Sequence, residues 1–164
     1  MRSDVRRGGW TTGMRAGLAA LLALLSIGAA GPAQAREAGG TRAAIDRVLA
    51  DYIGLYAAAT LPRWKELFHP KLSVAYPGDD GAVVVRDLEG FYERQRNYFA
   101  TGRAISERLE NIRVEEGRRI ARVTADFVFV DEGEERRGRL GLHLVQDNDA
   151  WKIVAIVFAY DQAA

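Results

Sequence analysis

Cysteine is absent from the 164-residue sequence. The chain therefore has no disulfide, no thiol nucleophile, no thiolate zinc site and no lipidated cysteine. Histidine is also scarce: His69 and His143 are far apart and lack clustered carboxylates, which is a poor arrangement for a metal site. We expect neither a metal nor a cofactor, and a fold that rests on its hydrophobic core alone.

The sequence has no apolar run long enough for a permanent membrane anchor. Its longest run, Ala16–Ala30, has fifteen residues, whereas a spanning helix needs about 20. A basic head precedes the run and Ala33-Gln34-Ala35 follows it, which is typical of a signal peptide. We predict that residues 1–35 are removed near Ala35 and that the protein is exported to a bacterial periplasm or secreted. The pair Arg6-Arg7 leaves both the general secretory and the twin-arginine route open.

A basic surface for nucleic acid is also lacking. The chain has 23 Lys and Arg against 22 Asp and Glu, but four Arg and one Asp lie within residues 1–35. The remaining chain has 19 basic and 21 acidic residues, a formal charge of −2. Composition therefore gives nucleic-acid binding no support.

Helical periodicity dominates the first half of the remaining chain. After a flexible lead-in over residues 36–41, apolar residues recur at spacings of three and four from Thr41 onward. Thr60 is expected to cap a short second helix that Pro70 ends, and Asp87 to cap a third. The residues on the apolar sides of these three helices are Ile45, Val48, Leu49, Tyr52, Tyr56, Trp64, Leu67, Phe68, Leu88, Phe91, Gln95, Tyr98 and Phe99.

The second half alternates with the period of two that is typical of strands. Two short strands, 72–77 and 82–86, precede the third helix, and longer strands joined by tight polar turns follow it. The longer strands are expected at 104–116, 119–130, 136–146 and 151–160. Helices first and an antiparallel meander afterwards indicate an α+β fold, a single domain over residues 42–162.

Three stretches of the sequence resemble the NTF2-like superfamily. They are AIDRVLADYIGLY at 44–56, WKELFHPKLSVAYP at 64–77 and HLVQDNDAWKIVAIVF at 143–158. The sequences of these stretches are most similar to those of SnoaL-like and lumazine-binding-like bacterial domains, and more distantly to those of ketosteroid isomerases. The resemblance implies three N-terminal helices packed on a strongly curved, mainly antiparallel sheet, which form a cone with a pocket inside. It predicts a fold and no single chemistry, because this fold hosts unrelated reactions.

Comparison with the ketosteroid isomerases concerns individual residues. Tyr52 and Phe68 keep the sixteen-residue spacing found between a first-helix tyrosine and a Leu-Phe pair in those enzymes. Where they carry a carboxylate base before a proline, this chain has Tyr76-Pro77, and where they hold a protonated acid, it has His143. The base is thus missing. Whether the protein is an enzyme stays open, since proton abstraction needs an acceptor near neutral pH.

The orientation of His143 follows from two arguments that conflict. Strand alternation separates it from Leu140, Leu142 and Leu144, so it faces outward if these leucines line the cone. The resemblance places it inward, and a β-bulge near a glycine, 138 or 141, would reconcile the two. We expect the inward orientation. Asp126 then either orients the imidazole or forms a salt bridge with an arginine, 122 or 139, on the outer face.

Three hypotheses of function follow. The first is a domain that binds a small apolar or aromatic molecule in its cone without evident catalysis. The second is a small-molecule lyase, isomerase or cyclase that uses His143 with Tyr52 or Asp126 as catalytic residues. The third is a non-catalytic dimeric module that binds a partner. The resemblance also implies a homodimer formed through the outer sheet face. The predicted ligand-binding residues are Tyr52, Trp64, Phe68, Tyr76, Phe91, Tyr98 and His143.

Overall fold

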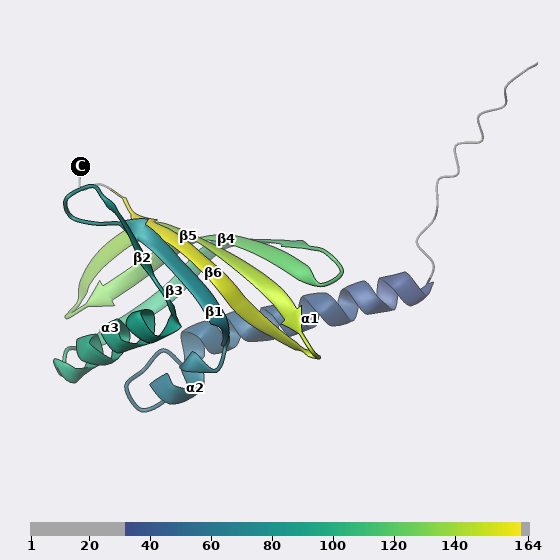
Figure 1. The fold of residues 1–164 in the computed structure, drawn as a ribbon, viewed down its shortest axis with the longest axis horizontal. Coiled ribbons are helices and arrows are strands. Elements are labelled where there is room, and N and C mark those ends of the chain that lie inside the picture. Colours follow the sequence, from purple (N-terminus) through teal and green to yellow (C-terminus); the bar gives the residue numbers. More distant parts are fainter. Residues whose placement is uncertain (1–31, 162–164) are drawn as a thin grey trace, which may run out of the picture.

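Six strands form one sheet with the order β2-β1-β6-β5-β4-β3, and three helices pack against it (Figure 1). The structure is a computed structural model that describes residues 32–161, with side chains from Gly40 onward. The helices are α1 (Pro32–Gly54), α2 (Leu61–Lys65) and α3 (Leu88–Ala100). The strands are β1 (Phe68–Pro77), β2 (Val83–Arg86), β3 (Ile105–Glu116), β4 (Ile120–Asp131), β5 (Glu134–Asp147) and β6 (Ala150–Tyr160).

Helix α1 buries the stripe that its periodicity predicts. Ile45, Leu49 and Tyr52 are 0%, 6% and 5% exposed and face the sheet. The helix begins at Pro32, so the predicted flexible lead-in at 36–41 is helical instead. Arg36, Glu37 and Ala38 are good helix formers, and α1 continues through Gly39 and Gly40 into the segment with strong helical periodicity. Most of the predicted signal peptide, residues 1–31, lies outside the described residues, and export stays a prediction. Within residues 32–161, no helix is both long and apolar enough to cross a membrane.

The ends of the shorter helices agree only partly with prediction. Asp87 caps α3, where its Oδ1 accepts a hydrogen bond of 2.9 Å from the backbone N–H of Gly90. Thr60 does not cap α2 with its side chain, because its hydroxyl donates to the carbonyl of Leu55 at 2.8 Å. Strand β1 begins at Phe68, so Pro70 lies inside a strand rather than at the end of a helix.

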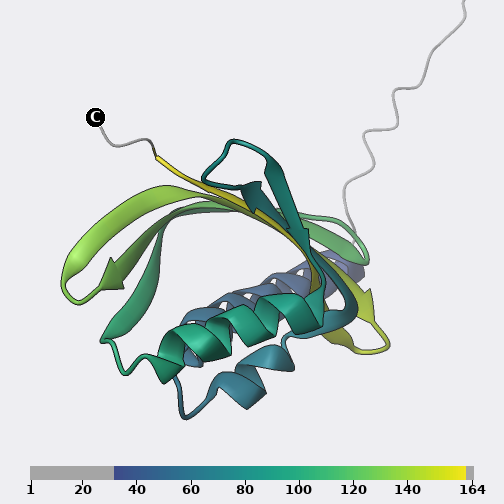
Figure 2. The same cartoon turned by 60° about the vertical axis from the view of Figure 1, so that its left-hand side comes forward.

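The sheet is strongly curved and its concave side faces the helices (Figure 2). Strands β3 to β6 form the predicted antiparallel meander, while β1 pairs with β6 in parallel and with β2 antiparallel. A bulge in β3 between Glu110 and Arg113 contains Asn111 with φ 52°, and β6 has an extra residue where it passes His143 and Leu144 of β5. Bulges bend a strand and exchange its two faces, so these positions help to curve the sheet.

Trp64 joins the helices to the sheet at the closed end of this cone. Its side chain is 1% exposed, and its indole Nε1 donates a hydrogen bond of 2.8 Å to the backbone carbonyl of Tyr52. Its ring also contacts those of Tyr56, Phe68 and Phe91, with centroids 4.6–5.6 Å apart. Such tilted and edge-to-face pairs add to the free energy of burial. One side chain thus ties α1, α2, β1 and α3 together.

Candidate functional site

A cavity of about 660 Å³ lies between the concave face of the sheet and helices α1 and α3. This volume is within the range of pockets that bind small organic molecules. Other depressions in the described part of the surface, including one on the outer sheet face, are more open to solvent. The interior of the cone is therefore the candidate site.

Aromatic and aliphatic side chains form most of the cavity wall. Tyr76 of β1 stacks on Phe158 of β6 with centroids 4.9 Å apart, and Phe158 meets Phe127 of β4 edge to face. Such a wall favours planar apolar ligands, because rings stack on rings and exclude water. The apolar lining residues are Tyr52, Tyr56, Trp64, Tyr76, Pro77, Val84, Phe91, Tyr98, Phe127, Phe129, Leu140, Ile156, Phe158, Ala159 and Tyr160.

Glu107 of β3 is the acidic group in the interior of the cavity. It pairs with Phe129 of β4 in the sheet register and its carboxyl group interacts with the hydroxyl of Tyr52. Burial raises the pKa of Glu107 from 4.5 to about 7, and the neighbouring Tyr52 hydroxyl offsets part of that rise. A carboxyl group with this pKa exchanges protons at neutral pH, as a general acid or base must.

Three other cavity hydroxyls, those of Tyr56, Tyr76 and Tyr98, have partners within the protein. Tyr56 donates to Oε1 of Gln95 at 2.6 Å, and Tyr98 donates to Oδ2 of Asp131 at 2.8 Å. The Tyr76 hydroxyl accepts from Nε of Arg86 at 2.8 Å. Burial raises the pKa of Tyr52 and of Tyr56 well above the usual tyrosine value, so both hydroxyls stay protonated. They can act as hydrogen-bond donors and not as bases.

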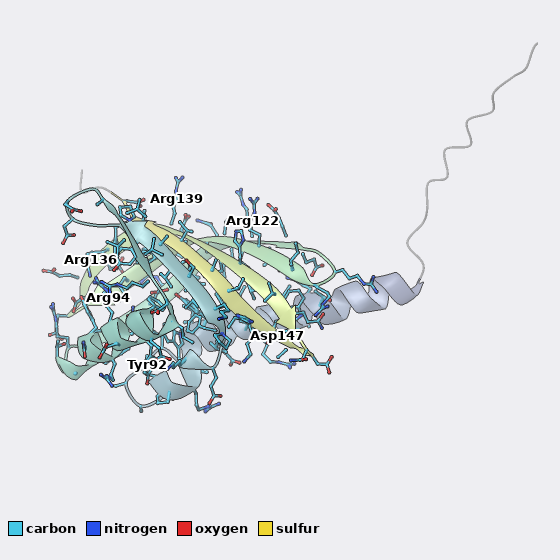
Figure 3. All side chains as sticks on the ribbon, viewed as in Figure 1. Tyr92, Arg94, Arg122, Arg136, Arg139 and Asp147 are labelled. Carbon is cyan, nitrogen blue, oxygen red and sulfur yellow. The ribbon has the colours of Figure 1, made fainter. Side chains whose placement is uncertain are left out.

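Three arginines lie at the open end of the cavity: Arg86 of β2, Arg94 of α3 and Arg136 of β5. Figure 3 shows Arg94 and Arg136 on the side where α3 faces the sheet. The guanidinium of Arg136 lies 4.8 Å from the ring centroid of Tyr160, and that of Arg94 lies 5.5 Å from the ring centroid of Tyr76. These contacts are cation–π interactions. The cavity thus combines an apolar interior with a positively charged opening.

Most predicted ligand-binding residues line this cavity. Tyr52, Trp64, Tyr76, Phe91 and Tyr98 come from α1, α2, β1 and α3 and meet at its wall. Phe68 is 3% exposed and lies behind the wall, where its ring packs on those of Tyr52, Trp64 and Phe91. Any role of these side chains toward a ligand stays a prediction.

The inward orientation predicted for His143 is wrong. His143 is exposed and sits between buried Leu142 and Leu144 on the outer face of β5. The pairing of β4 with β5 is continuous past both glycines at which a bulge was expected, and the bulge lies in β6 instead. Strand alternation therefore persists along β5, the leucines face the core, and the imidazole is excluded from the cavity.

Asp126 does not meet His143 either. In the register of the sheet, Asp126 lies opposite Arg139, whereas His143 lies opposite Arg122. The carboxylate accepts a hydrogen bond of 2.7 Å from Nδ2 of Asn111, in the bulge of β3. Asp126 is thus on the outer face, as one of the two interpretations of the sequence required, but its partner is an amide rather than an arginine. An enzyme that uses His143 with Asp126 is incompatible with this geometry.

The sequence reasoning missed the charged residues of the cavity, although period-two alternation contained the signal. Glu107 shares a strand face with Ile105 and Leu109. Arg136 has the same parity in β5 as Leu140, which faces the core. Charged residues near both of them in the sequence made their segments look like solvent-exposed surface. The two residues were therefore not predicted to line the cavity.

The described residues contain no group of three or more His, Cys, Asp or Glu side chains placed to hold a metal ion. This is compatible with the small number of such residues in the apolar cavity, and the expectation of no metal and no cofactor stays a prediction. The polar groups that the chain itself brings into the cone are carboxyl, phenol, carboxamide and guanidinium groups.

In this chain a curved six-stranded sheet and three helices enclose a cavity. This arrangement is the NTF2-like cone, an α+β fold. Residues 45–160 match the SnoaL-like domain family, and the chain belongs to this family within the NTF2-like superfamily. The resemblance noted in the sequence is thereby confirmed. A comparison with curated proteins finds no match.

Solved structures similar to this chain share its fold at low sequence identity. A putative scytalone dehydratase from Novosphingobium aromaticivorans has a TM-score of 0.65 at 16% identity, covering 78% of this chain and 89% of the other. An NTF2-like protein with a cystatin-like fold from the same organism has a TM-score of 0.65 at 16% identity, covering 80% and 89%. The beta subunit of benzoate 1,2-dioxygenase from Burkholderia mallei has a TM-score of 0.62 at 15% identity, covering 73% and 89%.

Family and fold together suggest small-molecule binding or isomerase-like activity as the class of function. They do not distinguish between the two, because NTF2-like cones host both. That distinction depends on the residues inside this cone.

The raised pKa of Glu107 predicts a specific dependence of stability on pH. The folded protein holds the Glu107 proton more tightly than the unfolded chain, so unfolding is favoured as pH rises from 4.5 to about 7. Glu107→Gln removes this dependence. We expect the variant to gain stability relative to the wild type across that window, by at most about 3 kcal/mol above pH 7. Urea unfolding at pH 5 and pH 8 measures the difference.

Glu116→Gln is the matched control, because Glu116 is an exposed residue of the same strand. It should leave the stability difference between the two pH values unchanged. Equal stability of Glu107→Gln and wild type at both pH values would contradict the buried, proton-holding carboxyl group.

Proposed function

We propose that the domain binds a small, largely aromatic or apolar molecule inside its cone. The observation that carries the proposal is the cavity of about 660 Å³ walled by rings from α1, α2, α3 and the concave sheet face. Polar groups beside these rings, such as Gln95 and Glu107, would orient the ligand. SnoaL-like domains and NTF2-like folds in general are compatible with this role.

A residue that fills the cavity should block binding. Leu140 lines the cavity, so Leu140→Trp would place an indole where the ligand lies, whereas Val157→Trp adds the same indole to the outer face, where Val157 is 59% exposed. With 2-naphthol as a neutral aromatic probe, we expect isothermal titration calorimetry to detect binding to the wild type and to Val157→Trp. Leu140→Trp should weaken binding at least tenfold. Equal affinity for all three proteins would place the probe outside the cone and contradict the proposal.

A second candidate is proton transfer on the bound molecule, which Glu107 supports more directly than any other residue. Its carboxyl group faces an apolar cavity, has a pKa of about 7 and lies beside the donor Tyr52. Glu107 therefore supplies an acceptor that Tyr76 cannot, at a different position from the base of the isomerases. The carboxylate would take a proton from the carbon next to a carbonyl, the C–H electron pair would form an enolate, and the proton would return to carbon.

Hydrogen–deuterium exchange tests this second candidate without knowledge of the natural substrate. In D₂O, 2-tetralone should incorporate deuterium next to its carbonyl faster with the wild-type protein than with Glu107→Gln, because the amide accepts no proton. Glu116→Gln should match the wild type. Proton NMR follows the loss of signal. Exchange that is equally fast with Glu107→Gln would exclude Glu107 as the acceptor and leave the binding proposal intact.

We also propose that two copies of the chain pair through the outer sheet face. Ile120 of β4 and Val157 of β6 are 65% and 59% exposed on that face. Exposed apolar side chains are unfavourable in water, and contact with a second copy would bury them. Val157→Asp should therefore shift the protein toward monomer in sedimentation velocity at micromolar concentration. Val85→Asp, at a 65% exposed position of the edge strand β2, is the control. A wild-type protein that sediments only as a monomer would contradict the dimer.

A further inference from the structure

Arginine side chains lie at the open end of the cone. Arg94 of α3 and Arg136 of β5 come from a helix and a strand that line the same cavity, and Figure 3 shows both on the side where α3 lies. We propose that these two arginines bind the carboxylate of an aromatic acid whose ring system occupies the cone. This inference rests on the proposed ligand-binding function and adds the chemical class of the ligand.

The first support is that neither guanidinium has an acidic partner among the described side chains. Some surface arginines on the sheet form ion pairs, such as Arg122 with Glu115 at 2.6 Å and Arg137 with Glu110 at 3.1 Å. Arg94 and Arg136 instead contact aromatic rings. Charged groups that a fold leaves without a counter-ion at the opening of a pocket are available to a ligand of opposite charge.

The second support is the number of donors left over. A guanidinium has five N–H groups arranged as a planar fork that matches a carboxylate. Arg136 uses Nη2 for a bond of 3.4 Å to the Tyr98 hydroxyl, and Arg86, the third arginine of the opening, uses Nε for Tyr76. Among the residues that the structure describes, the remaining donors of Arg94 and Arg136 have no hydrogen-bond acceptor beyond these ring contacts. A bidentate carboxylate would satisfy several of them at once.

The third support is that both positive charges act on the cavity interior. Burial raises the pKa of Tyr160, and the charges of Arg136 and Arg94 oppose this rise. Arg94 acts in the same direction on Tyr56, which lies deeper in the cone. Both arginine side chains are exposed, but they line the cavity and lie close enough to its tyrosines to act on them, so an acid that enters the cone is attracted to them.

Acidic groups at the same opening do not neutralise the pair. Asp79 and Asp80 in the β1–β2 turn also line the cavity, but Oδ1 of Asp80 accepts from the backbone N–H of Ala82 at 3.0 Å. Neither forms an ion pair with an arginine within 4 Å in the described residues. The charged residues that line the cavity are three arginines and three acidic residues, of which Glu107 has a pKa of about 7 and is partly protonated at neutral pH.

Matched acids and amides test the inference with the full chain. Isothermal titration calorimetry at pH 7.5 and low salt compares 2-naphthoate with 2-naphthamide, and indole-3-acetate with indole-3-acetamide. We expect each acid to bind at least tenfold more tightly than its amide. The double variant Arg94→Gln with Arg136→Gln should lose this preference and keep its affinity for the amides, because the aromatic wall is unchanged.

The control is the double variant Arg122→Gln with Arg139→Gln, which removes the same charge from the outer face (Figure 3). It should keep the tenfold preference. Acid and amide that bind the wild type equally well would overturn the carboxylate inference and leave the binding proposal standing. Absence of binding by all four probes up to millimolar concentration would overturn both. If the Arg94–Arg136 double variant fails to fold by circular dichroism, the single variant Arg94→Gln must reduce the preference at least threefold.

Discussion

The bond between the Trp64 indole and the Tyr52 carbonyl is the contact on which the cone depends. It lies in the buried cluster where α1, α2, β1 and α3 meet, and it satisfies both polar groups in a place without solvent. The rings around it, including Phe68 and Phe91, close the narrow end of the cone. Side chains fill this end of the cone. The curved sheet and the helices therefore enclose free space toward the other end, where the cavity opens.

Sheet curvature also decides which side chains enter that space. The bulge at Asn111 exchanges the faces of β3, so that Ile105, Glu107 and Leu109 point into the cone before it and Val114 after it. Without the extra residue, the second half of β3 would present its charged side chains to the core. Glu107 is thus held in the cavity by a strand whose register is fixed on both sides of the bulge.

Much of the fold could be predicted from the sequence, because the periodicity of its apolar residues is strong. The stripe from Ile45 to Tyr52 and the alternation from Leu140 to Leu144 both correspond to buried faces. His143 shows where the prediction failed: the alternation placed it outward, and the resemblance to isomerases was given more weight. A position matched across distant relatives says little about orientation, whereas strand alternation follows from the geometry of the backbone.

The charged residues of the site could not be found as easily, for a physical reason. Glu107 and Arg136 lie on strand faces that are apolar further along; Glu107 is followed by Arg108 and Glu110, and Arg136 lies between Glu135 and Arg137. Only the curvature of the sheet and the approach of α3 convert these positions from surface into cavity wall. Curvature depends on bulges, whose location is a property of pairing between strands and is not visible in one strand alone.

The positions of the acidic and basic groups that line the cone would determine the orientation of a bound ligand. Burial raises the pKa of Glu107 and Tyr52 partly offsets this rise, whereas Arg94 and Arg136 contact the rings of Tyr76 and Tyr160 in the cavity wall. An aromatic acid bound by Arg94 and Arg136 would keep its own carboxylate away from Glu107, because two carboxylates in an apolar space repel one another. Its ring or its far end would then face Glu107 and Tyr52. The two proposals for this cavity are therefore compatible: the arginines would set the direction of the molecule, and the buried carboxyl group would meet whatever group lies at its other end.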